Sequence, residues 1–405
     1  MDPLESFRAE TRQWLEDNAP ESLRGTATSP FAGHWGGRDA EFETADHQLW
    51  FERALERGWT APAWPTEYGG GGLSTDQHRV LLEELQRIGM PQPLVGFGLT
   101  MIGPVLLLCA NEEQKREHIP RIIRGEIRWC QGYSEPGAGS DLASLRTKAV
   151  RDGDDFVVSG QKVWTSHAEK SDWIFCLVRT NPDAPKKQQG ITFLIFDMQS
   201  PGITTRPIEL ISGASPFCEV FFHEVRVPVS QVIGEIDRGW GVAKALLGFE
   251  RAMVGEALAG GGTRPEILRG FDLRDHALEY VGLDGDRLAD PHFRDALADF
   301  EMDKECMRLT MQRGRDAQSM GKRPGAETSI SKIVGTELNQ RRWKLAVAMA
   351  GEQGLGWEGD AYSGREAAVT RTWLRSRANT IEGGTTEVQL NIVAKRILGM
   401  PQGNK

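Results

Sequence analysis

The sequence contains few cysteines, and they are widely separated. Its 405 residues include five, with no Cys-x-x-Cys pair among them: Cys109, Cys130, Cys176, Cys218 and Cys306. A disulfide framework or a structural zinc site is normally built from closely spaced cysteines. We therefore expect neither a disulfide framework nor a metal site, and interpret the five as reduced thiols of a cytoplasmic protein.

Long apolar runs and an excess of positive charge are also missing. The longest apolar candidate, "PVLLLCA", falls far short of the about 18 residues that a membrane-spanning helix needs. The N-terminal "MDPLESFRAETRQWLEDNAP" is acidic and lacks the basic and apolar regions of a signal peptide. The formal net charge of −9 argues against general nucleic-acid binding, which needs a basic surface. We expect no membrane span and no nucleic-acid partner.

The composition is that of a folded globular chain, with 39% hydrophobic and 26% charged residues. Its length predicts two or three packing units. Residues 1–126 show helical patterns. In "TDQHRVLLEELQRIGMP", for example, apolar residues recur at helical spacing, namely Val80, Leu81, Leu82, Leu85 and Ile88.

The pattern changes twice further along the chain. Residues 127–234 contain short runs rich in Val, Ile, Phe and Trp, such as "DFVVSGQKVWTS" and "CEVFFHEVRVP", which predict an antiparallel β unit. Residues 235–405 return to helical patterns, and the last helix is expected to bury Val388, Ile392 and Ile397. The sequence predicts an α+β fold, mainly α: an N-terminal helical domain, a central β domain and a C-terminal helical bundle.

Two segments at the β domain could bind a ligand or could simply be structural. The loop "QGYSEPGAGSDLA" (131–143) has the small residues that let backbone N–H groups approach a planar or anionic ligand, but a turn before a strand explains it equally well. It is not the G-x-G-x-x-G of a dinucleotide fold, and no strand–loop–helix unit surrounds it. Trp164 in "KVWTSHAEKSDW", taken alone, is more simply interpreted as core packing.

One acid stands in an otherwise apolar helical stretch. Glu250 in "LLGFERAMV" follows Phe249 and precedes Arg251 and three apolar residues. An exposed helix face is one explanation. The other is a carboxylate poised for proton abstraction, because burial at such a position raises the pKa of an acid.

Five motifs, taken together and in order, resemble those of the acyl-CoA dehydrogenase family of flavoproteins: "GYSEPGAGSDLA", "WTS", "FFHEVRVP", "FERAMVG" and "IEGGTTEVQLNIVAKRILG". The resemblance covers essentially the whole chain. It implies an N-terminal helical domain, a central antiparallel β-barrel-like domain and a C-terminal four-helix bundle, with boundaries at 1–126, 127–234 and 235–405.

The resemblance implies an FAD-dependent oxidoreductase of acyl-CoA catabolism or β-oxidation. A carboxylate would remove the α-proton of an acyl-CoA thioester while the β-hydrogen leaves as hydride to flavin N5, giving the trans-2-enoyl-CoA. The electrons would pass to an electron-transfer flavoprotein. Donors must hold the thioester oxygen, since an unassisted α-proton is too weakly acidic for a carboxylate.

The same resemblance implies which residues contact the ligands. Tyr133 and Ser134 would approach the flavin ring, and Trp164 would stack near it. The set implied for FAD is Gln131, Tyr133, Ser134, Gly139, Ser140, Trp164, Thr165, Ser166, Thr385 and Glu387. The set implied for the substrate is Ser140, Arg251 and Gly384.

The position of the base needs an alignment. The commoner family motif is Tyr-Glu-Gly-Thr, and matching its threonine to Thr385 places the usual acid at Gly383, with Glu382 one residue early. One residue displaces a side chain by roughly 3.8 Å, whereas proton abstraction needs contact at about 3 Å. A minority branch of the family has its base in a Leu-x-x-Glu-Arg-like pattern, which "GFERAMV" resembles. We therefore predict Glu250 as the base, Glu382 as the alternative, and the N–H of Gly383 as a donor to the thioester oxygen.

Two segments depart from the family pattern. The Arg-x-x-Phe-Gly motif that binds the FAD pyrophosphate across a subunit interface is missing from "EYVGLDGDRLADPHFRDALADF", and "AMAGEQGLGWEG" replaces the usual Gln-x-x-Gly-Gly segment. We expect a homo-oligomer (dimer or tetramer) with altered contacts, or a heteromer completed by a second acyl-CoA dehydrogenase-like chain. The alternatives to a dehydrogenase are a low-activity or non-catalytic subunit, or a flavin oxidase or monooxygenase on the same fold. The expected substrate is a medium-to-bulky acyl-CoA, ring-bearing or dicarboxylic groups included.

Overall fold

The computed structural model describes residues 2–27, 32–259, 266–320 and 325–401, and only the backbone at 251–259, 266, 315, 318 and 319. The chain forms two compact units. The first contains most of the chain up to Glu250, and the second contains the chain from Arg251 onward together with the short segment Leu210–Ala214.

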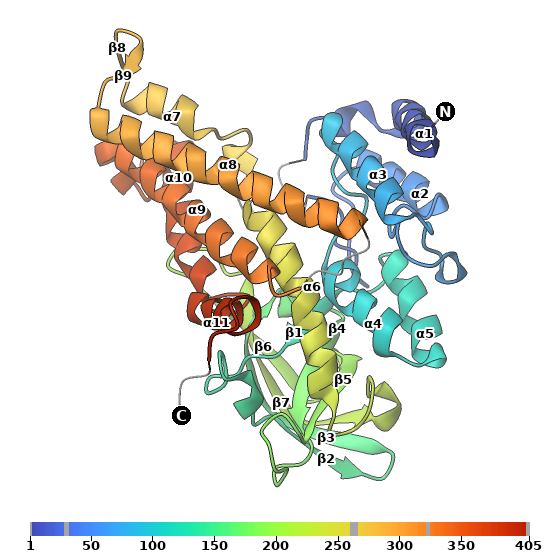
Figure 1. Ribbon diagram of the computed structural model, residues 1–405. Helices are drawn as coiled ribbons and strands as arrows, with labels where there is room; N and C mark the ends of the chain where they lie inside the picture. The colour runs from blue at the N-terminus through green and yellow to red at the C-terminus, as the bar shows by residue number, and fades with distance from the viewer. Residues whose placement is uncertain (1, 28–31, 260–265, 321–324, 402–405) are drawn as a thin grey trace. The chain divides into compact units, whose positions relative to one another are not determined.

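The first unit begins with the helices α1 to α5 (Figure 1). Capping boxes fix the N-terminal ends of two of them. Ser74 and Gln77 form a capping box at α3, and Asn111 and Gln114 form another at α5. These helices are α1 (Pro3–Asn18), α2 (Ala45–Glu56), α3 (Thr75–Arg87), α4 (Gly103–Cys109) and α5 (Glu112–Ile123). Their core contains Leu15, Trp50, Trp59, Leu81 and Leu85.

Two buried polar side chains tie this part of the molecule together. One joins two of the helices, and the other joins a helix to the chain that follows the last strand. Glu84 on α3 accepts hydrogen bonds from Arg8 and Arg12 on α1 at 2.8–3.2 Å. The Gln114 amide donates to the carbonyl oxygens of Ser230 and Val232 at 2.7 and 2.8 Å, after the last strand of the sheet. The helical part and the β domain therefore belong to one compact body.

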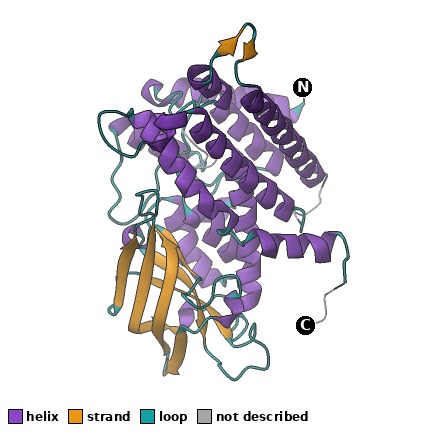
Figure 2. Ribbon diagram, turned by 90° about the vertical axis from the view of Figure 1, so that its left-hand side faces the viewer, coloured by secondary structure: helices purple, strands orange, loops and turns teal. Residues whose placement is uncertain are grey.

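The β domain is a seven-stranded sheet, seen in orange in Figure 2. Its strands are β1 (Trp129–Gly132), β2 (Lys148–Asp152), β3 (Asp155–Ser166), β4 (Trp173–Arg179), β5 (Ile191–Asp197), β6 (Ile203–Ile208) and β7 (Phe217–Pro228). Most neighbours are antiparallel, as the sequence predicts, but β1 and β2 each pair with β4 in parallel. The core of the sheet includes Cys130, Phe156, Ile174, Cys176 and Val220.

Helix α6 (Gly239–Ala259) begins with its first residue packed closely against the backbone of β5. A Cβ atom at Gly239 would lie 2.3 Å from the backbone nitrogen of Phe193 in β5, so only glycine fits there. Val242 and Leu246 are buried, and Glu250 follows at the same spacing of four residues. The buried face of α6 therefore carries Glu250.

The second unit is helical and is organised around α9, which contacts α7, α8, α10 and α11. Its core includes Phe271, Phe300, Leu338, Trp343 and Met349. Its elements are α7 (Leu273–Tyr280), the short hairpin β8 (Leu283–Asp284) and β9 (Arg287–Leu288), α8 (Pro291–Ser319), α9 (Thr328–Met349), α10 (Gly364–Ser376) and α11 (Thr386–Ile392).

The predicted burial at the end of the chain is wrong for one residue. Ile397 is 41% exposed, whereas Val388 and Ile392 are half-buried. The helix changes to a π turn at Val393–Ile397, where the N–H of Leu398 donates to the carbonyl of Val393. The wider turn rotates the residues that follow it away from the buried face.

The predicted fold class is confirmed: a helical part, a central β domain and a helical bundle follow one another along the chain. The boundaries after residues 126 and 234 remain predictions. Among the described residues, no helix has the length and apolar character needed to cross a bilayer.

Candidate active site

The two residues Gln131 and Glu250, 119 positions apart, meet in the first unit. The Nε2 atom of Gln131, in β1, donates to Oε2 of Glu250, in α6, at 3.1 Å. Successive side chains of a strand point to opposite faces, and the neighbouring Cys130 points into the sheet core. Gln131 and Tyr133 therefore share the face of β1 that Glu250 approaches.

Tyr133 adds a buried hydroxyl near this pair. Its side chain is 4% exposed, and its ring makes edge contacts with Phe175 and Phe193. Burial raises the pKa of Tyr133 well above 10, and the negative charge of Glu250 raises it further. No described residue forms a hydrogen bond with the hydroxyl. It is a neutral polar group beside Glu250 that a bound molecule could satisfy.

The loop after β1 is held by a buried ion pair. Nζ of Lys162, which is fully buried, lies 2.9 Å from Oε1 of Glu135 and donates to the carbonyl of Tyr133. The Glu135 carboxylate also accepts from the backbone N–H groups of Arg146 and Thr147. Burial alone would raise the pKa of Glu135, but the Lys162 charge and these hydrogen bonds outweigh it and lower that pKa.

The Trp164 region has the form expected of a surface that receives a planar ligand. Trp164 has a φ of 61° at a bulge where the β3–β7 register shifts, and its side chain is 54% exposed. This strained backbone is rare for a bulky residue, and such strain is concentrated at functional sites. The interpretation of Trp164 as core packing is therefore wrong. The bulge turns the ring outward.

The neighbours of Trp164 also fit the FAD prediction. The hydroxyl of Thr165 is fully buried without a hydrogen-bond partner among the described residues, and Ser166 is half-buried. Ser134 is tied to the same strand, because its carbonyl accepts from the N–H of Val163. A flavin needs hydrogen-bond donors at its ring edge, and the exposed ring beside these groups suits it. The FAD roles of Gln131, Tyr133, Ser134, Trp164, Thr165 and Ser166 remain predictions.

Gly139 and Ser140, expected near the CoA and cofactor phosphates, are exposed on the loop that the Glu135–Lys162 pair holds. A Cβ at Gly139 would meet no atom within 4 Å, so the backbone there is open to a ligand. Their roles stay predictions. The side chain of Arg251 lies outside the described residues, so its substrate role is not tested.

In the second unit, Glu382 is already engaged by two neighbours. Nη2 of Arg375 lies 2.8 Å from its Oε2, and the Asn379 amide donates to its Oε1. Each oxygen of this carboxylate therefore has a donor, one from the end of α10 and one from the residues just before Glu382. These contacts orient the Glu382 carboxylate toward Arg375 and Asn379.

The two glycines after Glu382 form a tight turn. Gly383 and Gly384 have φ values of 66° and 91°, which favour glycine. The Gln389 amide donates to the Gly383 carbonyl at 3.0 Å, and Thr385 caps α11 through Val388 N–H. The turn is well defined. The expected roles of Gly383, Gly384, Thr385 and the exposed Glu387 stay predictions.

Several residues of these sites were not predicted from the sequence. Lys332 on α9 is fully buried, and burial lowers its pKa while the charges of Glu382 and Glu387 oppose that shift. A lysine at an otherwise apolar position of the helical pattern would have been the signal that Lys332 is buried. Gln131 was predicted only for FAD, and no sequence pattern indicated its contact with Glu250.

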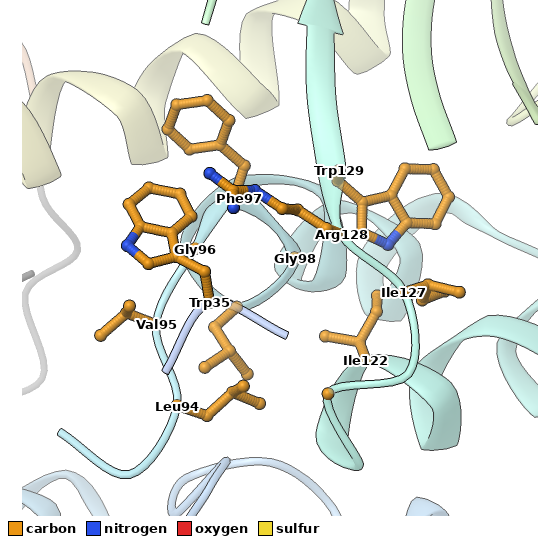
Figure 3. Close-up of a pocket in the computed structure, with 12 residues that line it drawn as sticks. Trp35, Leu94, Val95, Gly96, Phe97, Gly98, Ile122, Ile127, Arg128 and Trp129 are labelled. Carbon is orange, nitrogen blue, oxygen red and sulfur yellow. The ribbon is translucent and has the colours of Figure 1, made fainter. Parts of the chain in front are cut away.

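Two cavities of the first unit lie away from these residues. One, drawn in Figure 3 around Trp35, Phe97 and Arg128, has a volume of about 10 Å³, about the room for one water molecule. Another, of about 460 Å³, is lined by charged side chains such as Arg38, Glu169 and Lys170. Neither is lined by a predicted site residue.

Family models match three consecutive parts of the chain. They are described as acyl-CoA dehydrogenase N-terminal domain at residues 5–126, middle domain at 130–225 and C-terminal domain at 237–398. Together the matches span nearly the whole sequence.

Curated relatives and solved structures agree with the models. "Acyl-CoA dehydrogenase IpdE1" of Mycobacterium tuberculosis is 35% identical over 407 residues, covering 100% of both chains. A structure of "Tcur3481-Tcur3483 steroid ACAD" is 32% identical with a TM-score of 0.75, covering 99% of this chain and 98% of that one. The ChsE4-ChsE5 complex from Mycobacterium tuberculosis is 32% identical with a TM-score of 0.74, covering 100% and 99%.

Proposed function

Because the chain belongs to the acyl-CoA dehydrogenase family, whose members are FAD-dependent oxidoreductases acting on acyl-CoA, we propose that it converts an acyl-CoA thioester into the trans-2-enoyl-CoA with Glu250 as the base. The observation that carries this proposal is the 3.1 Å contact between Gln131 and Glu250. It places a carboxylate at the end of β1, next to the loop predicted for the flavin.

The contacts of the two candidate acids favour Glu250. Glu382 is already oriented by Arg375 and Asn379 within the second unit, and the family alignment places it one residue before the usual acid. Glu250 accepts a hydrogen bond from the Gln131 amide, which orients its carboxylate at the end of β1. A base must be ionised and able to reach its proton at hydrogen-bond distance.

The other residues would bind and orient the substrate and cofactor. The N–H of Gly383 would hold the thioester oxygen, which makes the α-proton more acidic by stabilising the developing enolate charge. The exposed ring of Trp164 and the hydroxyls of Thr165 and Ser166 would hold FAD. Bound FAD supplies the acceptor for the hydride, and we propose an electron-transfer flavoprotein as the next acceptor.

The relatives suggest the substrate class and the assembly. One similar structure is named a steroid ACAD with two protein names, and another is a complex of two named chains. We propose a bulky, ring-bearing acyl-CoA as substrate and a heteromer with a second acyl-CoA dehydrogenase-like chain. The missing pyrophosphate motif is consistent with a partner that completes the FAD site.

The test compares Glu250→Gln with Glu382→Gln in the FAD-loaded assembly. We expect Glu250→Gln to keep the yellow colour of bound FAD and to lower flavin reduction by acyl-CoA at least about a hundredfold, as loss of a general base does. Glu382→Gln should reduce flavin at a rate close to that of the parent. Absorbance near 450 nm during a single turnover measures both.

Two results would reject the proposal. Normal reduction by Glu250→Gln together with an inactive Glu382→Gln would assign the base to Glu382. A parent chain that binds FAD but is not reduced by any of a panel of linear, branched and ring-bearing acyl-CoA thioesters would favour a non-catalytic subunit. Oxygen consumption with substrate would instead indicate an oxidase or monooxygenase.

A further inference from the structure

The Gln131–Glu250 contact raises a question that the proposed function leaves open: what fixes the base. Glu250 lies on a long helix, on the face that also carries the buried Val242 and Leu246. A glutamate has three side-chain torsions, so the helix alone does not hold its carboxylate in one place.

We propose that Gln131 is a positioning residue, whose side-chain amide holds the Glu250 carboxylate at the end of β1 and keeps it oriented for proton abstraction. This inference rests on the proposed function of Glu250. The amide donates from a strand within a hydrogen-bonded sheet, which is more rigid than a loop. The geometry therefore fixes the distal end of the base, while α6 fixes its backbone.

The identity of the residue matters as well as its place. A charge-assisted hydrogen bond to a carboxylate favours the ionised form, whereas partial burial favours the neutral form. The amide of Gln131 therefore counteracts burial without adding a charge. A lysine or arginine at 131 would form an ion pair, as Arg375 does with Glu382, and would weaken the base.

Two described titratable groups, Tyr133 and Cys176, stay neutral in the acid range. Tyr133, after β1, lies near Glu250, and its pKa is raised far above 10 by burial and by the charge of Glu250. Cys176 in β4, near Tyr133, has its pKa raised to about 12 by burial. Both remain neutral where a carboxylate titrates. Neither group can therefore produce a change in the acid limb of the rate profile.

The experiment uses Gln131→Met, which keeps the length of the side chain and removes the donor, and Gln131→Glu, which keeps the volume and adds a like charge. The FAD-loaded assembly is assayed with acyl-CoA across pH. We expect Gln131→Met to lower kcat about ten- to a hundredfold with little change in KM. The acid limb of its kcat profile should move up by about 1 pH unit, and that of Gln131→Glu further.

Gln161→Met is the matched control. The Gln161 amide donates to a carboxylate oxygen of Glu219 at 2.8 Å in the same sheet, between β3 and β7. This variant loses a similar amide–carboxylate bond, so general damage to the sheet would affect it equally. We expect its kcat, acid limb, FAD content and thermal midpoint to match those of the parent.

The outcomes separate this inference from the proposed function. If Glu250→Gln is inactive but both Gln131 variants keep the parental kcat and acid limb, the positioning role is wrong and the base stands. If Glu250→Gln is active, both ideas fail. If Gln131→Met does not fold or bind FAD, Gln131→Glu decides, and an unshifted acid limb in that variant overturns the inference.

Discussion

At the scale of single residues, the ion pair between Lys162 and Glu135, which holds the loop after β1, is almost fully buried. Lys162 is 0% exposed and Glu135 is 8% exposed. The lysine joins β3 to this loop through the Glu135 carboxylate and the Tyr133 carbonyl. Tyr133 lies two residues after Gln131, which donates to the Glu250 carboxylate. The ion pair therefore supports the part of β1 that carries the proposed site.

Removing one partner of this pair should be costly. We predict that Lys162→Met lowers the free energy of unfolding by roughly 3–5 kcal/mol, because Glu135 is left as an uncompensated buried charge. Asp152→Asn is the control: it breaks an exposed pair with Arg226 in the same sheet, worth less than about 1 kcal/mol. Urea unfolding measures both. Equal losses in the two variants would contradict the prediction.

The lowered pKa of Glu135 also predicts how the difference in the free energy of unfolding between the parent and Glu135→Gln depends on pH. The pKa of Glu135 is lowered in the folded chain, so its contribution is fully present above the unfolded value of about 4.5 and is lost as the pH falls through the lower folded value. The difference between the parent and Glu135→Gln should therefore be constant from about pH 6 to 8. It should shrink as the pH falls below about 4.5.

At the scale of elements, local patterns were predicted and long-range pairings were not. The helix at Thr75–Arg87 follows from periodic apolar residues and a Ser74 cap, which are local features. The parallel β1–β4 pairing and the Trp164 bulge depend on partners far along the chain. The same holds for the Gln131–Glu250 contact, since periodicity carries no information about residues 119 positions apart.

The site residues also divide into those that a local motif indicated and contacts that no motif indicated. The motifs indicated Glu250, Trp164 and the Gly383–Gly384 turn, because each is a short pattern. The sequence also showed that Glu382 stands one place early. Its contact with Arg375 is a helix-end geometry that no motif revealed.

The start of α6 offers a test of how an element positions the base. We predict that Gly239→Ala displaces α6, because the new Cβ would lie 2.3 Å from Phe193 N and 2.7 Å from the Thr192 carbonyl carbon. Overpacking of this kind costs about 1–3 kcal/mol. A shift of about 1 Å at a catalytic group can cost about a hundredfold in rate, so kcat should fall as well as the thermal midpoint.

Gly241, two residues further along α6, provides the control. A Cβ there would meet no atom within 4 Å, and alanine is favoured over glycine in helices by up to about 1 kcal/mol. Gly241→Ala should therefore match or exceed the stability of the parent, with unchanged kcat. Loss of activity in both variants would mean that the helix start tolerates no side chain for another reason.

At the scale of the whole molecule, the last described segment exposes large apolar side chains. Leu390, Leu398 and Met400 are 51%, 66% and 54% exposed, and Ile397 is 41% exposed. Leu390 lies in α11 and Ile397 ends the π turn, and Leu398 and Met400 follow that turn. Clustered exposed apolar residues are typical of interaction surfaces rather than of open solvent-facing helices. This face therefore fits the oligomer that we propose.

We predict that this face is buried when the assembly forms, and that Leu398→Ser weakens association. Loss of one well-packed apolar contact at an interface costs about 1–3 kcal/mol, which weakens the dissociation constant by about ten- to a hundredfold. Leu283→Ser, at a residue 57% exposed in the β8–β9 hairpin, is the control and should leave association unchanged. Sedimentation velocity over a concentration series measures both variants. Parental association of Leu398→Ser would place the interface elsewhere on the chain. Dissociation of both variants would show that the effect is not specific to the segment that follows the π turn.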